Sequence, residues 1–262
     1  MSSSLLSISN LSVSFGGVKA LTDVSIDVPK NSVIGLIGPN GAGKTTVFNC
    51  ISGLVKSDSG TFSFEGMQRE FPKPHELVDL GITRTLQGVG LFNELSVIQN
   101  VMVGADKNYK SNFLKELFGL SGKVEAGLKQ RAEEALAWVG GSALIDSKPS
   151  ELSYPDSKRV ALARALVINP KLLLLDEPAA GLGQDEIDAL SALIKQLKRR
   201  CSVLIVEHHV DFVREISDSV SVLNFGKLIA AGHYDDVKEN PAVIEAYLGH
   251  TDNPDENSKL GA

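Results

Sequence analysis

The stretch GPNGAGKTT at residues 38–46 decides the fold of this sequence. It follows SVIGLI at 32–37, a continuous apolar run that predicts a strand buried on both faces, and it precedes the apolar segment VFNCISGLV at 47–55. The three glycines let the main chain curl so that successive N–H groups point inward, and a following helix adds the positive end of its dipole. The sequence therefore predicts a loop that binds phosphate.

Lys44 and Thr45 stand where this loop meets the helix. Lys44 is expected to reach the β- and γ-phosphates of ATP, and the Thr45 hydroxyl is expected to ligate Mg²⁺. A chance glycine-rich turn is disfavoured because the fixed positions and the strand–loop–helix context are all present. The nine residues assigned to nucleotide binding are Gly38, Pro39, Asn40, Gly41, Ala42, Gly43, Lys44, Thr45 and Thr46. Loops of this kind occur in kinases, GTPases and many ATPases, so other residues must decide the reaction.

The segment LLLLDEP at residues 172–178 supplies those other residues. Its apolar strand would deliver Asp176 beside the magnesium ion, and Glu177 follows directly. A carboxylate that faces the γ-phosphate can polarise an attacking water as a general base. The alternative is two acidic residues that merely cap a strand.

Strands alternate with helices along the chain, which predicts an α/β fold with a mainly parallel sheet. Strands are expected at 5–15, 24–28, 32–37, 60–65, 172–176 and 202–206. Helices are expected at 124–139, 156–168, 184–199 and near 241–248, with a hairpin around Asn224–Lys227.

Composition excludes several classes of protein. The 262 residues carry 26 Lys and Arg against 32 Asp and Glu, a net charge of −6, so a nucleic-acid footprint of clustered basic residues is absent. The two cysteines, Cys50 and Cys201, lie too far apart for a metal-binding spacing. No apolar run approaches the roughly 20 residues that cross a bilayer, and no signal peptide is recognisable, so the chain is expected in the cytoplasm.

Together these motifs and their spacing resemble the ATP-binding subunit of an ABC transporter over about residues 5–249. The resemblance implies a P-loop NTPase with a RecA-like parallel core sheet, an antiparallel β subdomain and an inserted α-helical subdomain at about 95–165. It makes 5–249 a single ATPase domain and leaves 250–262 as an expected disordered tail.

The resemblance also implies roles for isolated residues. Phe15, in SVSFGGVKAL, matches an aromatic that stacks on adenine, although it could be a simple apolar strand end. Gln87, in TRTLQGVGLF, matches the glutamine that contacts magnesium and the attacking water. His208, in LIVEHHVDF, matches the histidine that senses the γ-phosphate, and its neighbour His209 is expected to be a bystander.

Finer features are similar to the subunits that serve uptake of branched-chain or other hydrophobic amino acids. They are LFNELSVIQNVMVGA at 91–105, an insertion at about 105–125, PAAGL at 178–182 and NPAVIEAYLG at 240–249. Related systems for urea or lipopolysaccharide share several of these features and stay open. The resemblance implies integral membrane permease subunits, a second ATPase subunit and, indirectly, a substrate-binding protein as partners, with no nucleic acid. It places the chain peripherally on the cytoplasmic face of the inner membrane.

One motif departs from the family pattern. The family completes each site across a dimer with a signature loop, and here that segment reads ELSYPDSKRVALARAL at 151–166. Ser153 keeps the hydroxyl that would contact the opposing γ-phosphate, but Pro155 stands where the family's glycine offers an N–H. We expect a heterodimer in which this chain's own site is competent and the partner's site is weakened, unless Ser153 or Tyr154 compensates. Gly183 is a second departure, because the family has an aspartate there.

Three other functions compete with that of a transport ATPase. The first is a soluble ABC-type ATPase that acts on DNA or ribosomes, which would carry two cassettes or a long coiled-coil insertion. The second is a subunit with weak or asymmetric ATPase activity that regulates a partner, which Pro155 favours and intact Lys44 and Glu177 oppose. The third is a P-loop kinase, for which no acceptor lid is evident.

Overall fold

The structure is a computed structural model that describes residues 4–85, 88–105 and 122–248. The chain divides into two compact units: Met1–Pro74 together with Ser202–Ala262 form the first, and His75–Cys201 form the second. The insertion predicted at about 105–125 lies largely outside the described residues, and so does the tail from 250 to 262.

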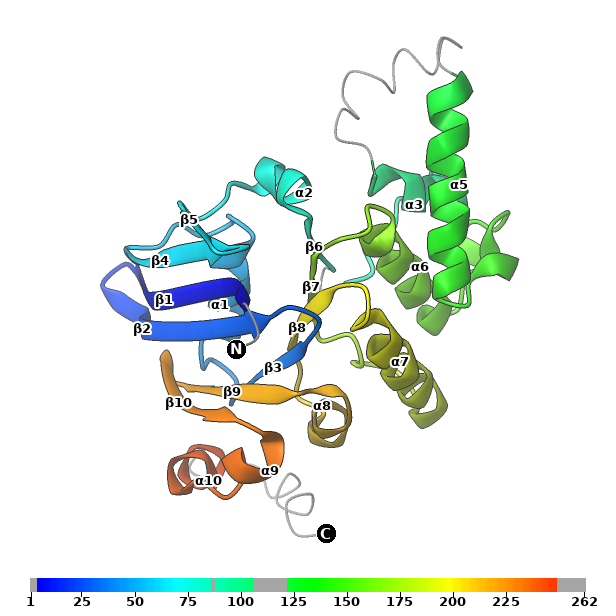
Figure 1. Ribbon diagram of the computed structural model, residues 1–262. Helices are drawn as coiled ribbons and strands as arrows, with labels where there is room; N and C mark the ends of the chain where they lie inside the picture. Colours follow the sequence, from blue (N-terminus) through cyan, green and yellow to red (C-terminus); the bar gives the residue numbers. More distant parts are fainter. Residues whose placement is uncertain (1–3, 86–87, 106–121, 249–262) are drawn as a thin grey trace. The chain divides into compact units, whose positions relative to one another are not determined.

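An antiparallel sheet forms the N-terminal part of the first unit (Figure 1). Its strand order is β2-β1-β4-β5, with bounds β1 Ser4–Phe15, β2 Val18–Pro29, β4 Ser59–Phe64 and β5 Met67–Arg69. The strands expected at 5–15, 24–28 and 60–65 are therefore present. The second strand starts earlier than expected, because Gly16 and Gly17 adopt φ of 53° and 88° and close a tight hairpin in which Phe15 pairs with Val18.

A second layer of the first unit is built around β3 (Val33–Ile37). It pairs in parallel with β8 (Ser202–Val206) and with β9 (Ser219–Asn224), and β10 (Lys227–Gly232) pairs antiparallel with β9. Every residue of β3 and β8 is buried, which is why both segments are continuous apolar runs. The expected parallel core is confirmed, and so is the hairpin around Asn224–Lys227.

Helices complete the first unit: α1 Lys44–Ile51, α8 Val210–Ile216, α9 Tyr234–Val237 and α10 Pro241–Leu248. A buried cluster joins the last three to the strands and consists of Ile37, Val213, Val220, Val222, Tyr234, Val237 and Val243. The partly buried Tyr247 packs against this cluster. The C-terminal helices are thus anchored directly beneath the strand that leads into the glycine-rich loop.

The second unit is mainly helical (Figure 1). Its helices are α2 Leu77–Leu80, α3 Val97–Val103, α5 Gly122–Trp138, α6 Tyr154–Leu166 and α7 Gln184–Leu197, with 3₁₀ turns at Pro74–Glu76, Ser142–Leu144 and Pro149–Glu151. The strands β6 (Ile82–Arg84) and β7 (Leu172–Asp176) pair in parallel. Helices α3, α5 and α6 pack on one another.

The helix expected at 156–168 starts two residues earlier, at Tyr154. Ser153 caps it with its side chain, and Pro155 fits the first turn because that position needs no N–H for the helix. Within the described parts of the chain, every helix is too short or too polar to span a bilayer.

Candidate nucleotide-binding site

The glycine-rich loop lies between the end of β3 and the start of α1, in the first unit. Gly38, Gly41 and Gly43 have φ of 144°, 77° and 105°, conformations that other residues rarely adopt. A Cβ at Gly38 would lie 2.1 Å from the carbonyl oxygen of Leu223, and one at Gly43 would lie 2.7 Å from Leu21 Cδ2. The loop is therefore pressed against β9 on one side and β2 on the other.

Lys44 is the first residue of α1, and its side chain extends back into the curl of this loop. Its Nζ donates hydrogen bonds to the carbonyl oxygens of Gly38 at 2.6 Å and Pro39 at 2.9 Å, and its side chain is buried. The first turn of α1 contains no acidic residue, so nothing on that turn offsets the positive end of the helix dipole. The turn at Gly226 supports the loop from behind, because its N–H donates to Ala42 O at 3.0 Å.

Phe15 lies at the end of β1, half exposed at 50%. The second strand of the same hairpin reaches the loop, since Ala20 O and Leu21 Cδ2 both approach Gly43. The structure thus brings the hairpin that carries Phe15 to the glycine-rich loop and leaves part of the ring open to solvent.

His208 follows β8 in the same unit and is exposed. The carboxylate of Glu207, itself only 4% exposed, accepts hydrogen bonds from the main-chain N–H of His208 at 3.0 Å and of His209 at 3.3 Å. Sequence reasoning missed Glu207, although a carboxylate directly after a buried strand is an unusual feature that could have revealed it.

Asp176 is the last residue of β7, in the second unit, and is 5% exposed. Its Oδ2 forms an ion pair with Arg84 Nη2 at 2.7 Å, and its N–H donates to Thr85 Oγ1 at 3.4 Å. The pairing of β6 with β7 places Arg84 and Thr85 there, since Arg84 aligns with Leu174. Sequence reasoning missed Arg84, because only the sheet register brings it to the aspartate.

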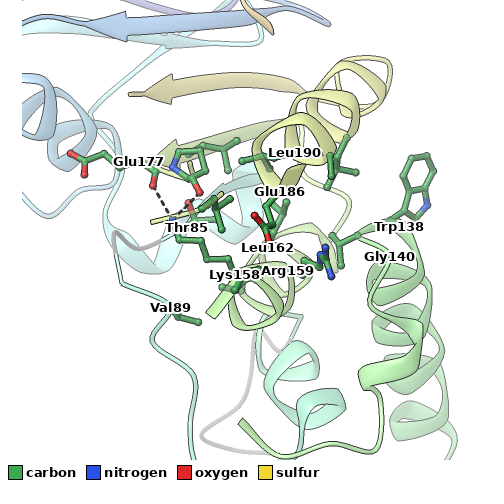
Figure 2. Close-up of a pocket in the computed structure, with 18 of the residues that line it drawn as sticks. Thr85, Val89, Trp138, Gly140, Lys158, Arg159, Leu162, Glu177, Glu186 and Leu190 are labelled. Carbon is green, nitrogen blue, oxygen red and sulfur yellow. Dashed lines mark hydrogen bonds between the residues drawn. The ribbon is translucent and has the colours of Figure 1, made fainter. Parts of the chain in front are cut away.

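Glu177 follows Asp176 and lies at a pocket of about 390 Å³ within the second unit (Figure 2). The pocket is bounded by α6 and α7, and Figure 2 shows Lys158 extending from α6 toward the main chain at Glu177. Glu177 has φ of 49°, a left-handed conformation that is uncommon for a residue with a long side chain. Apolar side chains such as Leu162 and Leu190 line much of the rest of this pocket.

Ser153 serves as the N-cap of α6. Its Oγ accepts from the N–H of Asp156 at 3.2 Å and donates to Asp156 Oδ2 at 2.7 Å. Asp156 also forms an ion pair with Arg159 at 2.8 Å. The hydroxyl assigned to an opposing phosphate is thus hydrogen-bonded within its own helix turn.

The residues that the sequence assigns to nucleotide binding and hydrolysis are divided between the two compact units. Phe15, the loop 38–46 and His208 belong to the first unit, whereas Asp176, Glu177 and Ser153 belong to the second. Gln87 lies outside the described residues. The hydroxyl of Thr45 and the carboxylate of Asp176 are each hard oxygen donors of the kind that Mg²⁺ prefers. The ion pair with Arg84 uses only Oδ2 of the two carboxylate oxygens.

The first unit contains a strand followed by a glycine-rich loop that encloses a lysine, and then by a helix. The second unit contains a buried strand that ends in two acidic residues. These features define a P-loop nucleoside triphosphatase. Comparison with known proteins gives the family. Residues 21–180 match the family model described as ABC transporter, and the chain belongs to this family of ATP-binding cassettes, which are ATPases that power transport. Residues 227–253 match a second model, described as branched-chain amino acid ATP-binding cassette transporter.

Individual relatives agree with this assignment. The chain is 36% identical over 253 residues to the high-affinity branched-chain amino acid transport ATP-binding protein BraF of Pseudomonas aeruginosa, covering 95% of this chain and 99% of that protein. It is 37% identical over 257 residues to the corresponding protein LivG of Salmonella typhimurium, with the same coverage.

Solved structures show the same fold. A nucleotide-free ATP-binding cassette from an ABC transporter aligns with a TM-score of 0.82 at 33% identity, covering 94% of this chain and 99% of that one. An ATP-binding cassette in its ADP conformation aligns with a TM-score of 0.80 at 32% identity and the same coverage. The expected α/β fold and the resemblance to an ABC transporter ATP-binding subunit are therefore confirmed.

Proposed function

We propose that this chain binds and hydrolyses ATP to drive uptake of branched-chain or other hydrophobic amino acids across a membrane. The observation that carries the proposal is the phosphate loop curled around Lys44, in a chain that aligns over 95% of its length with branched-chain amino acid transport ATP-binding proteins. The match of residues 227–253 to a branched-chain amino acid transporter model supports the same substrate class.

In the proposed site, the loop from Gly38 to Thr46 holds the phosphates of ATP. The main-chain N–H groups and the α1 N-terminus favour negative charge there, and Lys44 supplies a buried ammonium. Phe15 offers a half-exposed ring for the adenine to stack on. These residues account for binding but not for hydrolysis.

Hydrolysis is assigned to Glu177, His208 and Gln87. Thr45, Asp176 and Gln87 would hold Mg²⁺, which neutralises charge on the phosphates when bound. Glu177 acts as the general base that takes a proton from the attacking water. His208, with its main chain fixed by Glu207, and Gln87 orient the γ-phosphate and that water.

The proposed partners are integral membrane permease subunits and a second ATPase subunit, with a substrate-binding protein acting through the permeases. Such an assembly would hold the chain peripherally at the cytoplasmic face of the inner membrane. Systems for urea or lipid substrates are the alternatives within the family, because the ATPase subunit does not contact the transported molecule.

The N-terminus of α6 favours a second candidate function. In this alternative the two nucleotide sites of the assembly, one on this chain and one on its partner subunit, hydrolyse ATP at different rates. Pro155 has no N–H, and the N–H groups of Asp156 and Ser157 both bond to Ser153. The carboxylate of Asp156 also stands in the first helical turn, where it opposes a second anion. The γ-phosphate of an ATP bound to the partner subunit would therefore meet few hydrogen-bond donors at this helix. We infer that the partner's site hydrolyses ATP more slowly than this chain's own site.

The test is reconstitution. The chain is coexpressed with the permease subunits, the second ATPase subunit and the substrate-binding protein of a branched-chain amino acid transporter, and the assembly is placed in vesicles. It is then assayed for ATP-dependent uptake of labelled leucine, isoleucine and valine, with urea as comparison. We expect uptake of the three amino acids only with ATP. Uptake of urea alone would overturn the substrate class, and an assembly without ATPase activity would overturn the proposed function.

The asymmetry has its own test in the same assembly. Equal hydrolysis by this chain's site and the partner's site, measured with each subunit's general base replaced in turn, would contradict it. So would a purified chain that dimerises by itself and hydrolyses ATP at both sites.

A further inference from the structure

Lys158 and Tyr154 lie one turn apart on the same face of α6 and both contact the chain that follows Glu177. The ammonium of Lys158 donates hydrogen bonds to three main-chain oxygens: Glu177 O at 3.3 Å, Pro178 O at 2.8 Å and Ala180 O at 2.5 Å. Figure 2 shows the side chain reaching this segment from α6. The Lys158 ammonium thus binds three of the four main-chain carbonyl groups in residues 177–180.

Tyr154 supports the same segment by a separate contact. Its hydroxyl donates to Ala180 O at 3.4 Å, and a Cβ at Gly181 would lie 2.9 Å from its Cε1, so the ring rests against that glycine. The Nζ of Lys158 is 5.3 Å from the centre of the Tyr154 ring, within the range of a cation–π interaction. The two side chains therefore form one contact surface, which continues into the capped N-terminus of α6.

Glu177 needs such support because of its backbone. Its φ of 49° is a strained conformation for glutamate, of the kind that persists only where the surroundings determine it. The turn contributes one hydrogen bond, from Ala180 N–H to Glu177 O at 3.2 Å, and Lys158 adds a charged donor to the same oxygen. Because φ sets the direction in which the side chain leaves the backbone, these bonds also aim the carboxylate.

We propose that Lys158 is a positioning residue for ATP hydrolysis, which holds the main chain of Glu177 so that its carboxylate points at the attacking water. The residue does not touch the nucleotide and acts through Glu177. The assignment rests on the proposed role of Glu177 as the general base. It also implies that changes at the N-terminus of α6, where Ser153 and Pro155 lie, reach the base through Tyr154 and Lys158.

The test compares Lys158→Met with wild type in the assembled transporter. Methionine keeps the length and packing of the chain but removes every hydrogen bond to the carbonyl oxygens. We expect kcat to fall about tenfold or more, since small displacements of a catalytic group are costly, while the KM for ATP stays within twofold. Lys129→Met, at an exposed ion pair on α5, is the matched control and leaves both constants unchanged. Lys158→Arg keeps donors and charge, and its kcat is expected to lie between those of wild type and Lys158→Met.

A double-mutant cycle separates positioning from a general structural role. In a Glu177→Gln background the Lys158→Met substitution is expected to have no further effect on the residual single-turnover rate, because the base is already gone. The inference is overturned if Lys158→Met keeps kcat within twofold of wild type, if it raises KM in proportion to the loss of kcat, or if its effect is undiminished in Glu177→Gln. A wild-type assembly without ATPase activity would instead count against the proposed function.

Discussion

Arg84 Nη2 lies 2.7 Å from Asp176 Oδ2, and the two side chains are only 11% and 5% exposed. Removal of one partner from a buried pair leaves the other charge uncompensated, which is more costly than never having the pair. We therefore expect Arg84→Met to lower the free energy of unfolding by about 3 kcal/mol, measured by urea denaturation. The exposed Arg199→Met serves as control. A loss no larger than that of the control would show that solvent reaches the pair.

Lys44 provides a direct test of the phosphate loop. Lys44→Ala removes the ammonium that the loop encloses, and we expect affinity for ATP to fall at least 100-fold, about 2.7 kcal/mol, in titrations with a fluorescent ATP analogue. The exposed Lys30→Ala is the control. Unchanged affinity in Lys44→Ala would contradict the assignment of residues 38–46 to phosphate.

Glu177 separates binding from hydrolysis. Glu177→Gln preserves the shape of the side chain but removes the carboxylate that accepts a proton, so we expect kcat to fall 100-fold or more. ATP binding is expected to stay within a few-fold of wild type, because the phosphate loop is unaltered. Steady-state ATPase assays and nucleotide titrations check this, with the exposed Glu133→Gln on α5 as control. Near-normal turnover would eliminate Glu177 as the base.

The sequence predicts well what is local in this protein. The strand 33–37, the loop and α1 are consecutive, so glycine spacing and apolar runs are enough to predict them. Arg84 and Asp176 are 92 residues apart, and only the pairing of β6 with β7 brings them together. The sequence does not predict helix α8, because its seven residues are too few for a clear helical period.

The contact between Lys158 and Glu177 is hidden from sequence for another reason. It depends on the left-handed φ of Glu177 and on the turn from Glu177 to Ala180, which presents three carbonyl oxygens to one ammonium. Backbone conformations of this kind are set by tertiary contacts and leave no pattern in residue type. Side chains that act on the main chain of another residue, as Lys158 does on Glu177, are therefore missed by sequence reasoning, in addition to partners such as Arg84 that the sheet register brings together.

Two glycines of the phosphate loop are expected to differ sharply in their tolerance of alanine. A Cβ at Gly38 would lie 2.1 Å from Leu223 O, whereas a Cβ at Gly41 would meet nothing within 4 Å. We therefore expect Gly41→Ala to lower the free energy of unfolding by only about 1 kcal/mol, because alanine is strained at a left-handed φ. Gly38→Ala must also displace β9, and we expect a loss of about 3 kcal/mol or more by urea denaturation. Equal losses would contradict the close approach of the loop to β9.

Tyr247 is expected to make the free energy of unfolding depend on pH in the alkaline range. Burial, and to a smaller extent nearby Tyr234, raise the pKa of the Tyr247 phenol, whereas a hydrogen bond from the main chain of Gly38 lowers it, and together they place it at about 12. The unfolded chain ionises this phenol near pH 10, so its contribution is complete below pH 10 and is lost as the pH rises from 10 to about 12. Between pH 9 and 11 we expect wild type to lose about 1 kcal/mol more than Tyr247→Phe in urea denaturation. All other titratable groups are the same in both proteins, so their contributions cancel in the difference. Parallel losses in the two proteins would show that the Tyr247 phenol ionises as readily in the folded protein as in the unfolded chain.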